Sequence, residues 1–283
     1  MKLSLYVLMG FVLLLLISTK VWSADFQKGL NAYKKKDYAN ALREWKRLAE
    51  QGHTAAQYSL GVLHGKGEGI PQNHMTAVKW YTLAAEQGFA KAQYNLGIMY
   101  RNGKGVSQNN RIAAKWYTLA ADQGVANAQN NLGLMYRDGE GVLQNHQAAV
   151  NWFILAAEQG NAAGQFNLGV MYNKGKGVLQ NHQAAVNWFI LAANQGFVDA
   201  QFNLGVMYYN GEGVPQDFVH AHMWLNIAAL QGDKDAIERR DFCANRMIPS
   251  QLEEAQNLAA ECVKKKYKGC GTECILKLFP HKR

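Results

Sequence analysis

The fold is decided by the stretch from Ala92 to Asn127, AQYNLGIMYRNGKGVSQNNRIAAKWYTLAADQGVAN. The same plan recurs, without insertion or deletion, at residues 56–91, 128–163, 164–199 and 200–235. A fixed period of this length is the signature of a solenoid, in which each repeat buries its apolar face on its neighbours. The sequence therefore predicts five consecutive 36-residue repeats in one elongated domain.

Each repeat is expected to form two helices. In the second repeat, the first helix should run from about Lys91 to Arg101 and be followed by a glycine-rich loop. Loop glycines can end the first helix in the left-handed conformation; the expected pairs are Gly65/Gly67, Gly103/Gly105, Gly139/Gly141, Gly175/Gly177 and Gly211/Gly213. The second helix should begin at an Asn or Asp cap; the expected caps are Asn73, Asn109 or Asn110, Asn145, Asn181 and Asp217.

Small and large residues recur inside these helices. A glycine in mid-helix costs up to ~1 kcal/mol relative to alanine, so its recurrence predicts the close approach of a neighbouring helix. These glycines are Gly61, Gly97, Gly133, Gly169 and Gly205. The recurring tryptophans are expected to supply the large packing element of the core; they are Trp80, Trp116, Trp152, Trp188 and Trp224.

The combined pattern is A-x-x-x-L-G-x-x-Y-x-x-G-x-G-V followed by A-x-x-W-x-x-x-A-A-x-Q-G. It resembles the Sel1-like repeat, a relative of the tetratricopeptide repeat, in a bacterial, exported protein. The resemblance implies an all-α fold, a right-handed α-solenoid of antiparallel helix pairs, and a usual role in binding other proteins. A secreted, cysteine-rich subgroup staples its repeats with disulfides, but the repeats of this chain contain no cysteine and match that subgroup poorly.

Residues 1–24 have the composition of a secretory signal peptide. Lys2 provides a basic start, Leu5 to Ser18 is uncharged and apolar, and Val21 and Ser23 suit a cleavage site before Ala24 or just after it. The alternative is an uncleaved membrane anchor, although the run is shorter than the ~20 residues that a span needs. We expect a periplasmic or secreted protein with no stable membrane span after cleavage.

Two non-standard segments flank the repeats. Residues 25–55 form an atypical first repeat, with a helix capped by Asp37. Residues 236–266 are expected to form C-terminal capping helices: Pro249 breaks the chain, and residues 250–253 have the composition of a capping box. These segments bring the expected total to about fourteen helices.

The remaining residues, 267–283, form a basic tail that contains cysteine. All four cysteines lie near this end, at Cys243, Cys262, Cys270 and Cys274. An even number in an exported chain favours two disulfides. If the last two helices pack antiparallel, Cys243 and Cys262 lie too far apart to pair, so we expect each to pair with Cys270 or Cys274. A four-cysteine zinc site is the alternative, but its spacing is poor, and we expect no metal.

The formal net charge of +9 is concentrated at the ends of the chain. The tail from Glu261 carries seven basic and two acidic residues, whereas the repeats are close to neutral. Nucleic-acid binding usually needs a basic stripe on a folded face, so we expect no nucleic-acid partner. The tail could make electrostatic contact with the cell envelope.

A polar strip on the first helix of each repeat is the candidate partner-binding site. Its central column reads Ser59, Asn95, Asn131, Asn167 and Asn203, and its end column reads Asn102, Asp138, Lys174 and Asn210. If these helices line the concave surface, the asparagines form a ladder of amides that could clamp an extended peptide backbone. The alternative is that each asparagine braces the neighbouring repeat.

These features predict a non-catalytic exported scaffold that binds a protein or peptide partner and uses no cofactor. No Ser-His-Asp order or HExxH motif stands out. One alternative is an envelope hydrolase that acts on β-lactam or peptidoglycan bonds. Another is a surface adhesion factor that binds anionic polymers through the basic tail.

Overall fold

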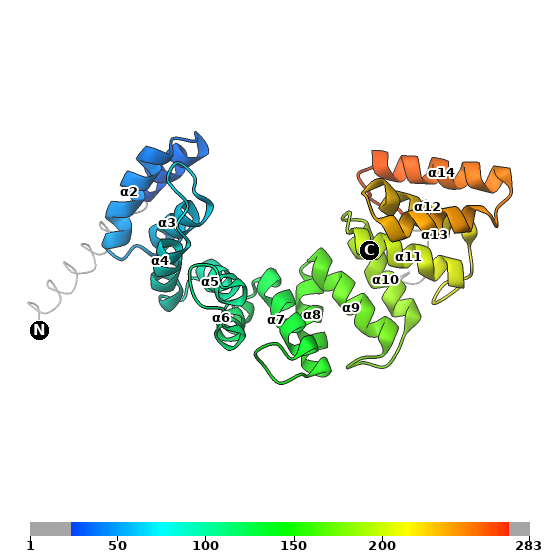
Figure 1. The fold of residues 1–283 in the computed structure, drawn as a ribbon, viewed down its shortest axis with the longest axis horizontal. Coiled ribbons are helices and arrows are strands. Elements are labelled where there is room, and N and C mark those ends of the chain that lie inside the picture. The colour runs from blue at the N-terminus through cyan, green and yellow to red at the C-terminus, as the bar shows by residue number, and fades with distance from the viewer. Residues whose placement is uncertain (1–23, 272–283) are drawn as a thin grey trace, which may run out of the picture. The chain divides into compact units, whose positions relative to one another are not determined.

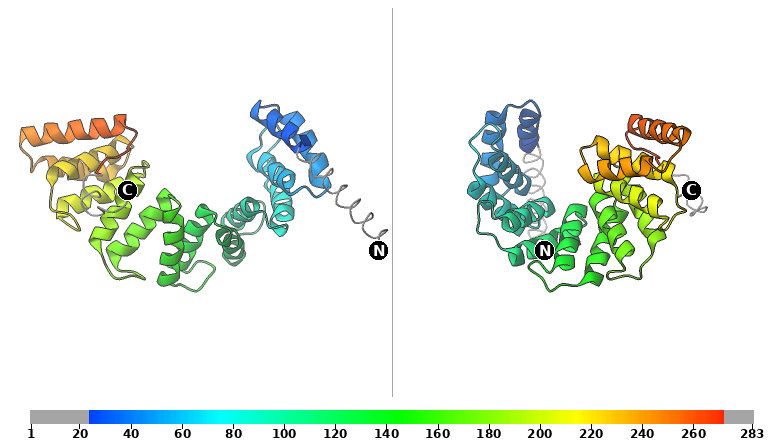
Figure 2. Two further views of the ribbon diagram at one scale, coloured as in Figure 1. Left: turned by 180° about the vertical axis from the view of Figure 1, so that it is seen from behind. Right: turned by 45° about the vertical axis from the view of Figure 1, so that its right-hand side comes forward.

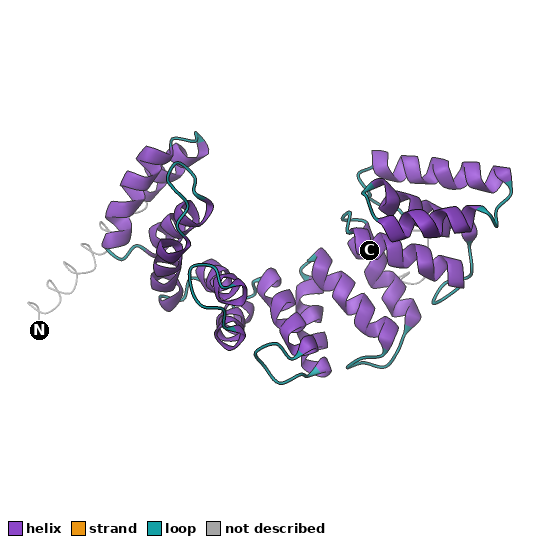
Figure 3. Cartoon of the chain, in the orientation of Figure 1, coloured by secondary structure: helices purple, strands orange, loops and turns teal. Residues whose placement is uncertain are grey.

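The computed structural model describes residues 24–271, so the expected signal peptide and Cys274 lie outside the described residues. Within this range all regular structure is helical (Figure 3). Residues 24–34 are helical and precede thirteen further helices, which agrees with the expected all-α fold and helix number. Their bounds are α2 (Tyr38–Glu50), α3 (Thr54–Lys66), α4 (His74–Glu86), α5 (Ala90–Asn102), α6 (Asn110–Asp122), α7 (Ala126–Asp138), α8 (His146–Glu158), α9 (Ala162–Lys174), α10 (His182–Ala193), α11 (Val198–Asn210), α12 (Phe218–Leu230), α13 (Lys234–Ala244) and α14 (Pro249–Lys264).

The chain divides into two compact units, Met1–Val125 and Ala126–Arg283. In the N-terminal unit, α3 pairs with α4, α5 pairs with α6, and α4 packs on α5 (Figure 1). In the C-terminal unit, the pairs α7–α8, α9–α10 and α11–α12 follow one another in chain order (Figure 2). Within each unit, each helix pair therefore buries its apolar side on the next pair, as a solenoid requires.

The boundaries of the helices are set by side-chain caps at the expected positions. Asn73, Asn109, Asn145, Asn181 and Asp217 each accept a backbone N–H at 2.9–3.0 Å. This satisfies one of the donors that a helix start leaves free.

One loop assignment was wrong. Gly65 lies inside α3, and the glycines with positive φ in the loop that follows α3 are Gly67 and Gly69. Gly67 is the C-cap of α3, at φ 71°. The physical reason is that the helix continues to Lys66, so the left-handed residue is needed two positions after Gly65.

The mid-helix glycines allow the two helices of a repeat to touch, as predicted. A Cβ atom on Gly169 would lie 2.7 Å from the ring of Phe189, which is fully buried. The same buried position is occupied in turn by Tyr81, Tyr117, Phe153, Phe189 and Leu225. The core is therefore built from a glycine on one helix and a large side chain on the other.

The prediction that tryptophan supplies this large element was wrong for four repeats. Trp80, Trp116, Trp152 and Trp188 are only partly buried, and Trp224 alone among the five is fully buried. The residue after each tryptophan takes the central place. One position along a helix is a rotation of about 100°, which turns the indole from the centre of the core towards its edge.

The atypical first repeat closes the N-terminal unit. Asp37 caps α2 as expected, and Ala41, Trp45 and Leu48 are buried. The ring of Phe26 stacks on Trp45 with centroids 5.9 Å apart. The hydroxyl of Tyr33 donates to Glu68 at 2.6 Å, which ties this repeat to the next.

The C-terminal cap differs from the expected arrangement. Pro249 is the first residue of α14, and the N-cap is Ile248, not Ser250. Proline suits this position because its φ is preset and no N–H is needed. Both α13 and α14 pack on α12 and not as an antiparallel pair on each other.

Among residues 24–271, no helix combines the length and the apolar character needed to cross a bilayer.

Candidate binding surface

The first helices of the repeats are α3, α5, α7, α9 and α11, and each is buried on most of its circumference. On α5, Ala92, Leu96 and Met99 lie in the core. Asn95 and Ile98 remain partly exposed. We call the partly exposed side of these helices the first-helix strip, which is a separate surface in each unit; besides the Ser/Asn column and the end column it contains Val62 and Ile98 in the N-terminal unit and Leu134, Val170 and Val206 in the C-terminal unit.

The side chains of the asparagine column differ in burial and in hydrogen-bond partners. Asn95 is hydrogen bonded to the side chains of Tyr58 and Tyr81. Burial raises the pKa of Tyr81, and the bond with Asn95 opposes this effect. Asn167 is 7% exposed; its Nδ2 donates to Asn130 at 2.8 Å. These contacts join neighbouring helices, so Asn95 and Asn167 have the geometry of the bracing alternative.

The other members of the column are bonded locally or stay half-buried. The hydroxyl of Ser59 donates to the carbonyl of Ala55 at 2.8 Å. Nδ2 of Asn203 donates to the carbonyl of Asp199 at 2.7 Å. Asn131 is half-buried on α7. Because an asparagine amide has two donors and two acceptor sites, Asn203 keeps hydrogen-bonding capacity for a partner.

The end column lies at the C-terminal ends of the first helices and is exposed. Asn102, Asp138, Lys174 and Asn210 all have high exposure. Asp138 accepts two hydrogen bonds from Arg137 at 2.8 Å, and Asn210 donates to Glu212 at 3.0 Å. The structure thus brings these residues to the same edge of their helices, next to the glycine loops.

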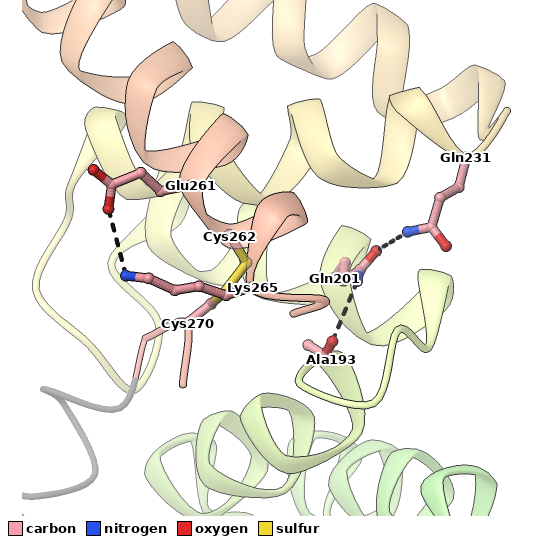
Figure 4. Close-up of a disulfide and its surroundings, with 7 residues drawn as sticks. All are labelled: Ala193, Gln201, Gln231, Glu261, Cys262, Lys265 and Cys270. Atoms are coloured by element: carbon pink, nitrogen blue, oxygen red, sulfur yellow. Dashed lines mark hydrogen bonds and ion pairs between the residues drawn. A yellow bond between two sulfur atoms is a disulfide. The ribbon is translucent and has the colours of Figure 1, made fainter. Parts of the chain in front are cut away.

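A ladder of buried glutamines, missed by the sequence reasoning, ties the repeats together. These residues are Gln57, Gln93, Gln129, Gln165 and Gln201, each at most 5% exposed. Each accepts a bond of 2.6–2.8 Å from the glutamine that closes its repeat. Gln57, Gln93, Gln165 and Gln201 also donate to a carbonyl of the preceding helix at 3.1–3.2 Å. Figure 4 shows both bonds of Gln201, to Ala193 and from Gln231. The signal was present, because a small residue followed by Gln recurs in all five repeats.

The C-terminal cap contains a disulfide between Cys262 and Cys270, with Cα atoms 5.7 Å apart (Figure 4). This pairing is one of those expected. The second expected bond, which would then join Cys243 to Cys274, stays a prediction because Cys274 lies outside the described residues. Cys243 is a fully buried thiol whose Sγ lies 3.4 Å from the carbonyl of Phe218. Burial raises the pKa of Cys243 to about 11, and a thiol that stays protonated at neutral pH is a poor nucleophile.

Beside the disulfide lies an open cavity of about 380 Å³. Its wall includes Tyr208, His220, Glu261 and Lys265. Lys265 pairs with Glu261 at 3.4 Å. Within residues 24–271, no group of three or more His, Cys, Asp or Glu side chains is arranged to hold a metal ion. The zinc alternative would need Cys262 and Cys270 as ligands, but they are bonded to each other.

Comparisons with known proteins agree with the repeat structure. The model of the Sel1 repeat matches residues 54–89, 90–125, 126–161, 162–197 and 198–233. These are the expected five repeats with boundaries two residues earlier, so that each begins where a first helix begins. No curated protein matches the chain.

Two solved structures are similar in both sequence and fold. One is a protective antigen present in uropathogenic Escherichia coli strains, described as displaying an SLR fold, with 35% identity and a TM-score of 0.77 over 85% of this chain. The chain spans 53% of the length of that protein. The other is a Sel1 repeat protein from Oxalobacter formigenes, with 34% identity and a TM-score of 0.74, covering 82% of this chain and 94% of that one.

Proposed function

We propose, because this chain belongs to the Sel1 repeat family, that it is an exported scaffold that binds another protein or peptide through the first-helix strip. Sel1 repeat proteins generally act as scaffolds for protein interaction, and their fold is typically non-enzymatic. The composition of residues 1–24 supports export to the periplasm or beyond.

The observation that carries the proposal is the mixed character of the first-helix strip. In the C-terminal unit, Leu134, Val170 and Val206 are partly exposed beside Asn131 and Asn203. Apolar contact area next to amides with spare hydrogen-bonding capacity suits a peptide, whose backbone needs both donors and acceptors. The repeat places these side chains at the same register on successive helices.

The residues of the strip would have different roles in binding. Asn203 and the exposed end-column residues Lys174 and Asn210 are available to a partner. Asn167 is buried and bonded to Asn130, so we assign it to the support of the surface. The comparisons do not favour the two alternatives, an envelope hydrolase and an adhesion factor.

A test compares two pairs of substitutions with equal chemistry. V170R/V206R changes the first-helix strip, whereas L155R/L191R changes second helices at side chains that are 43% and 40% exposed. We expect V170R/V206R to abolish capture of the native partner in crosslinking pulldowns from the envelope, and L155R/L191R to leave it unchanged. Thermal unfolding of all proteins checks that the fold persists.

If both variants capture the partner equally well, the first-helix strip is not the binding surface. N203A is a milder second variant for the case in which arginine disturbs the packing. It removes only one amide, and we expect it to weaken capture without changing the melting temperature.

A further inference from the structure

The first-helix strip changes chemistry at its C-terminal end. Although the period fails after residue 235 as a full repeat, α13 keeps the 36-residue register of a first helix: Ala236 follows Ala200 by 36 positions. In that register Arg239, Phe242 and Arg246 stand where Asn203, Val206 and Asn210 stand on α11. Two cations and an aromatic ring thus replace two amides and an aliphatic side chain.

Arg239 and Phe242 are three residues apart on α13 and share one face of it, and Arg246, in the turn after α13 ends at Ala244, stacks on Phe242. The guanidinium carbon of Arg239 lies 5.6 Å from the ring centre of Phe202. That of Arg246 lies 5.3 Å from Phe242 and 5.8 Å from Tyr209. Stacking on aromatic rings restricts both guanidinium groups while leaving them accessible, and Phe242 itself is 55% exposed.

A small cavity of about 60 Å³ lies in the middle of this surface. It is lined by Val206 and Tyr209 from α11, by Leu225 from α12, and by Arg239 and Phe242 from α13. Apolar and aromatic side chains form most of its wall. It can therefore receive part of an apolar side chain between the two arginines.

Among residues 24–271, no carboxylate forms an ion pair with Arg239 or Arg246, whereas the neighbouring Arg240 pairs with Asp241 at 2.7 Å. A guanidinium group fits a carboxylate through two parallel hydrogen bonds. Arginine and aromatic residues are also enriched where binding energy is concentrated in interfaces.

We propose that the α11–α13 patch, formed by Phe202, Val206, Tyr209, Arg239, Phe242 and Arg246, binds an acidic peptide segment of the partner, with an apolar side chain between two carboxylates. The inference rests on the proposed scaffold function and names the chemistry of the partner. Arg239 and Arg246 are seven residues apart, which is about 10 Å along a helix, and Arg246 lies just beyond Ala244, the last helical residue of α13. In an extended segment Glu-x-Phe-x-Glu, all three side chains point to one side and the glutamates are about 13 Å apart, a separation that the long arginine side chains can match.

Fluorescence anisotropy on the mature full chain tests this inference. The probe is fluorescein-labelled Gly-Glu-Ser-Phe-Ser-Glu-Gly, and its neutral counterpart has Gln in place of both Glu. We expect the acidic peptide to bind at least tenfold more tightly than the neutral one, and added salt to weaken it. R239E/R246E should lose at least tenfold in affinity.

K234E/K264E is the matched control, because it makes the same change in net charge at exposed lysines on α13 and α14. We expect its affinity for the acidic peptide to stay within twofold of the wild type. Circular dichroism confirms that every variant is folded.

The inference is overturned if the neutral peptide binds as well as the acidic one, if R239E/R246E and K234E/K264E behave alike, or if the folded wild type binds neither peptide. These failures are distinct from failure of the scaffold. If V170R/V206R abolishes partner capture but R239E/R246E does not, the scaffold proposal stands and the acidic segment is rejected.

Discussion

The glutamine ladder gives the sharpest test of how the repeats hold together, and Gln165 is the best position for it. Its Nε2 donates to the carbonyl of Ala157 at 3.2 Å, and its Oε1 accepts from Gln195 at 2.8 Å. The side chain is 5% exposed. The substitution Q165A removes both bonds and leaves their partners to find water or remain unpaired.

The cost follows from the state of those partners. Ala157 is 2% exposed, but its carbonyl also accepts from the N–H of Gly160 at 2.9 Å. The substitution therefore leaves this buried carbonyl with a hydrogen-bond partner. Gln195 is exposed and can turn to solvent. An unsatisfied buried group costs about 1–3 kcal/mol, and we place Q165A near the lower half of that range. A loss of this size lowers the melting temperature by about 3–6 °C in a unit of this length.

Thermal unfolding followed by far-ultraviolet circular dichroism measures this shift. Q147A is the control, because Gln147 is exposed and makes one bond of 3.3 Å to Asn151; we expect no change beyond about 0.5 kcal/mol. Q165M keeps the side-chain volume but removes both bonds. If Q165M is as stable as the wild type, the bonds of the ladder do not stabilise the repeats and the reasoning is refuted.

Three further predictions concern packing, covalent structure and pH. G169A places a Cβ atom 2.7 Å from the Phe189 ring and should lower the free energy of unfolding by about 1–3 kcal/mol. Adding F189L to G169A should recover part of this loss. An unchanged melting temperature for G169A would contradict the close packing of Gly169 on Phe189. Non-reducing peptide mapping should return Cys262 linked to Cys270, and a link from Cys262 to any other cysteine contradicts it. Burial lowers the pKa of His222 in the folded protein, so this imidazole binds a proton more readily in the unfolded chain. The free energy of unfolding should therefore fall as pH drops below about 6.5. The substitution H222L should make that fall shallower. Identical pH profiles for the two proteins would exclude His222 as a contributor.

The periodic parts of the fold could be read from the sequence because their causes are local. An Asn or Asp side chain caps a helix through its own neighbouring N–H groups, and all five expected cap positions are confirmed. The C-terminal cap could not be read in this way. Proline is favoured at the first position of a helix, so the start of α14 at Pro249 had a local signal, but the packing of both α13 and α14 on α12 had none.

The position of the candidate surface could be predicted from the sequence, but the hydrogen bonds of its side chains could not. The register of the repeat placed the asparagine column on the partly exposed side of the first helices. What each asparagine contacts depends on the adjacent helix. Asn167 bonds to Asn130, which stands where other repeats have an aromatic residue such as Tyr94 or Phe166. The arginines of α13 were overlooked because the period appeared to end at residue 235.

Site-specific photocrosslinking tests the central claim, that the first-helix strip is the binding surface, most directly. The photoreactive residue benzoylphenylalanine replaces Asn131 or Asn203 in one set of proteins, and Leu155 or Leu191 on second helices in the control set. After irradiation in the native envelope, we predict crosslinks to one common partner from the first set and none from the second. Crosslinks only from the second-helix positions, or equal crosslinks from both sets, would contradict the claim.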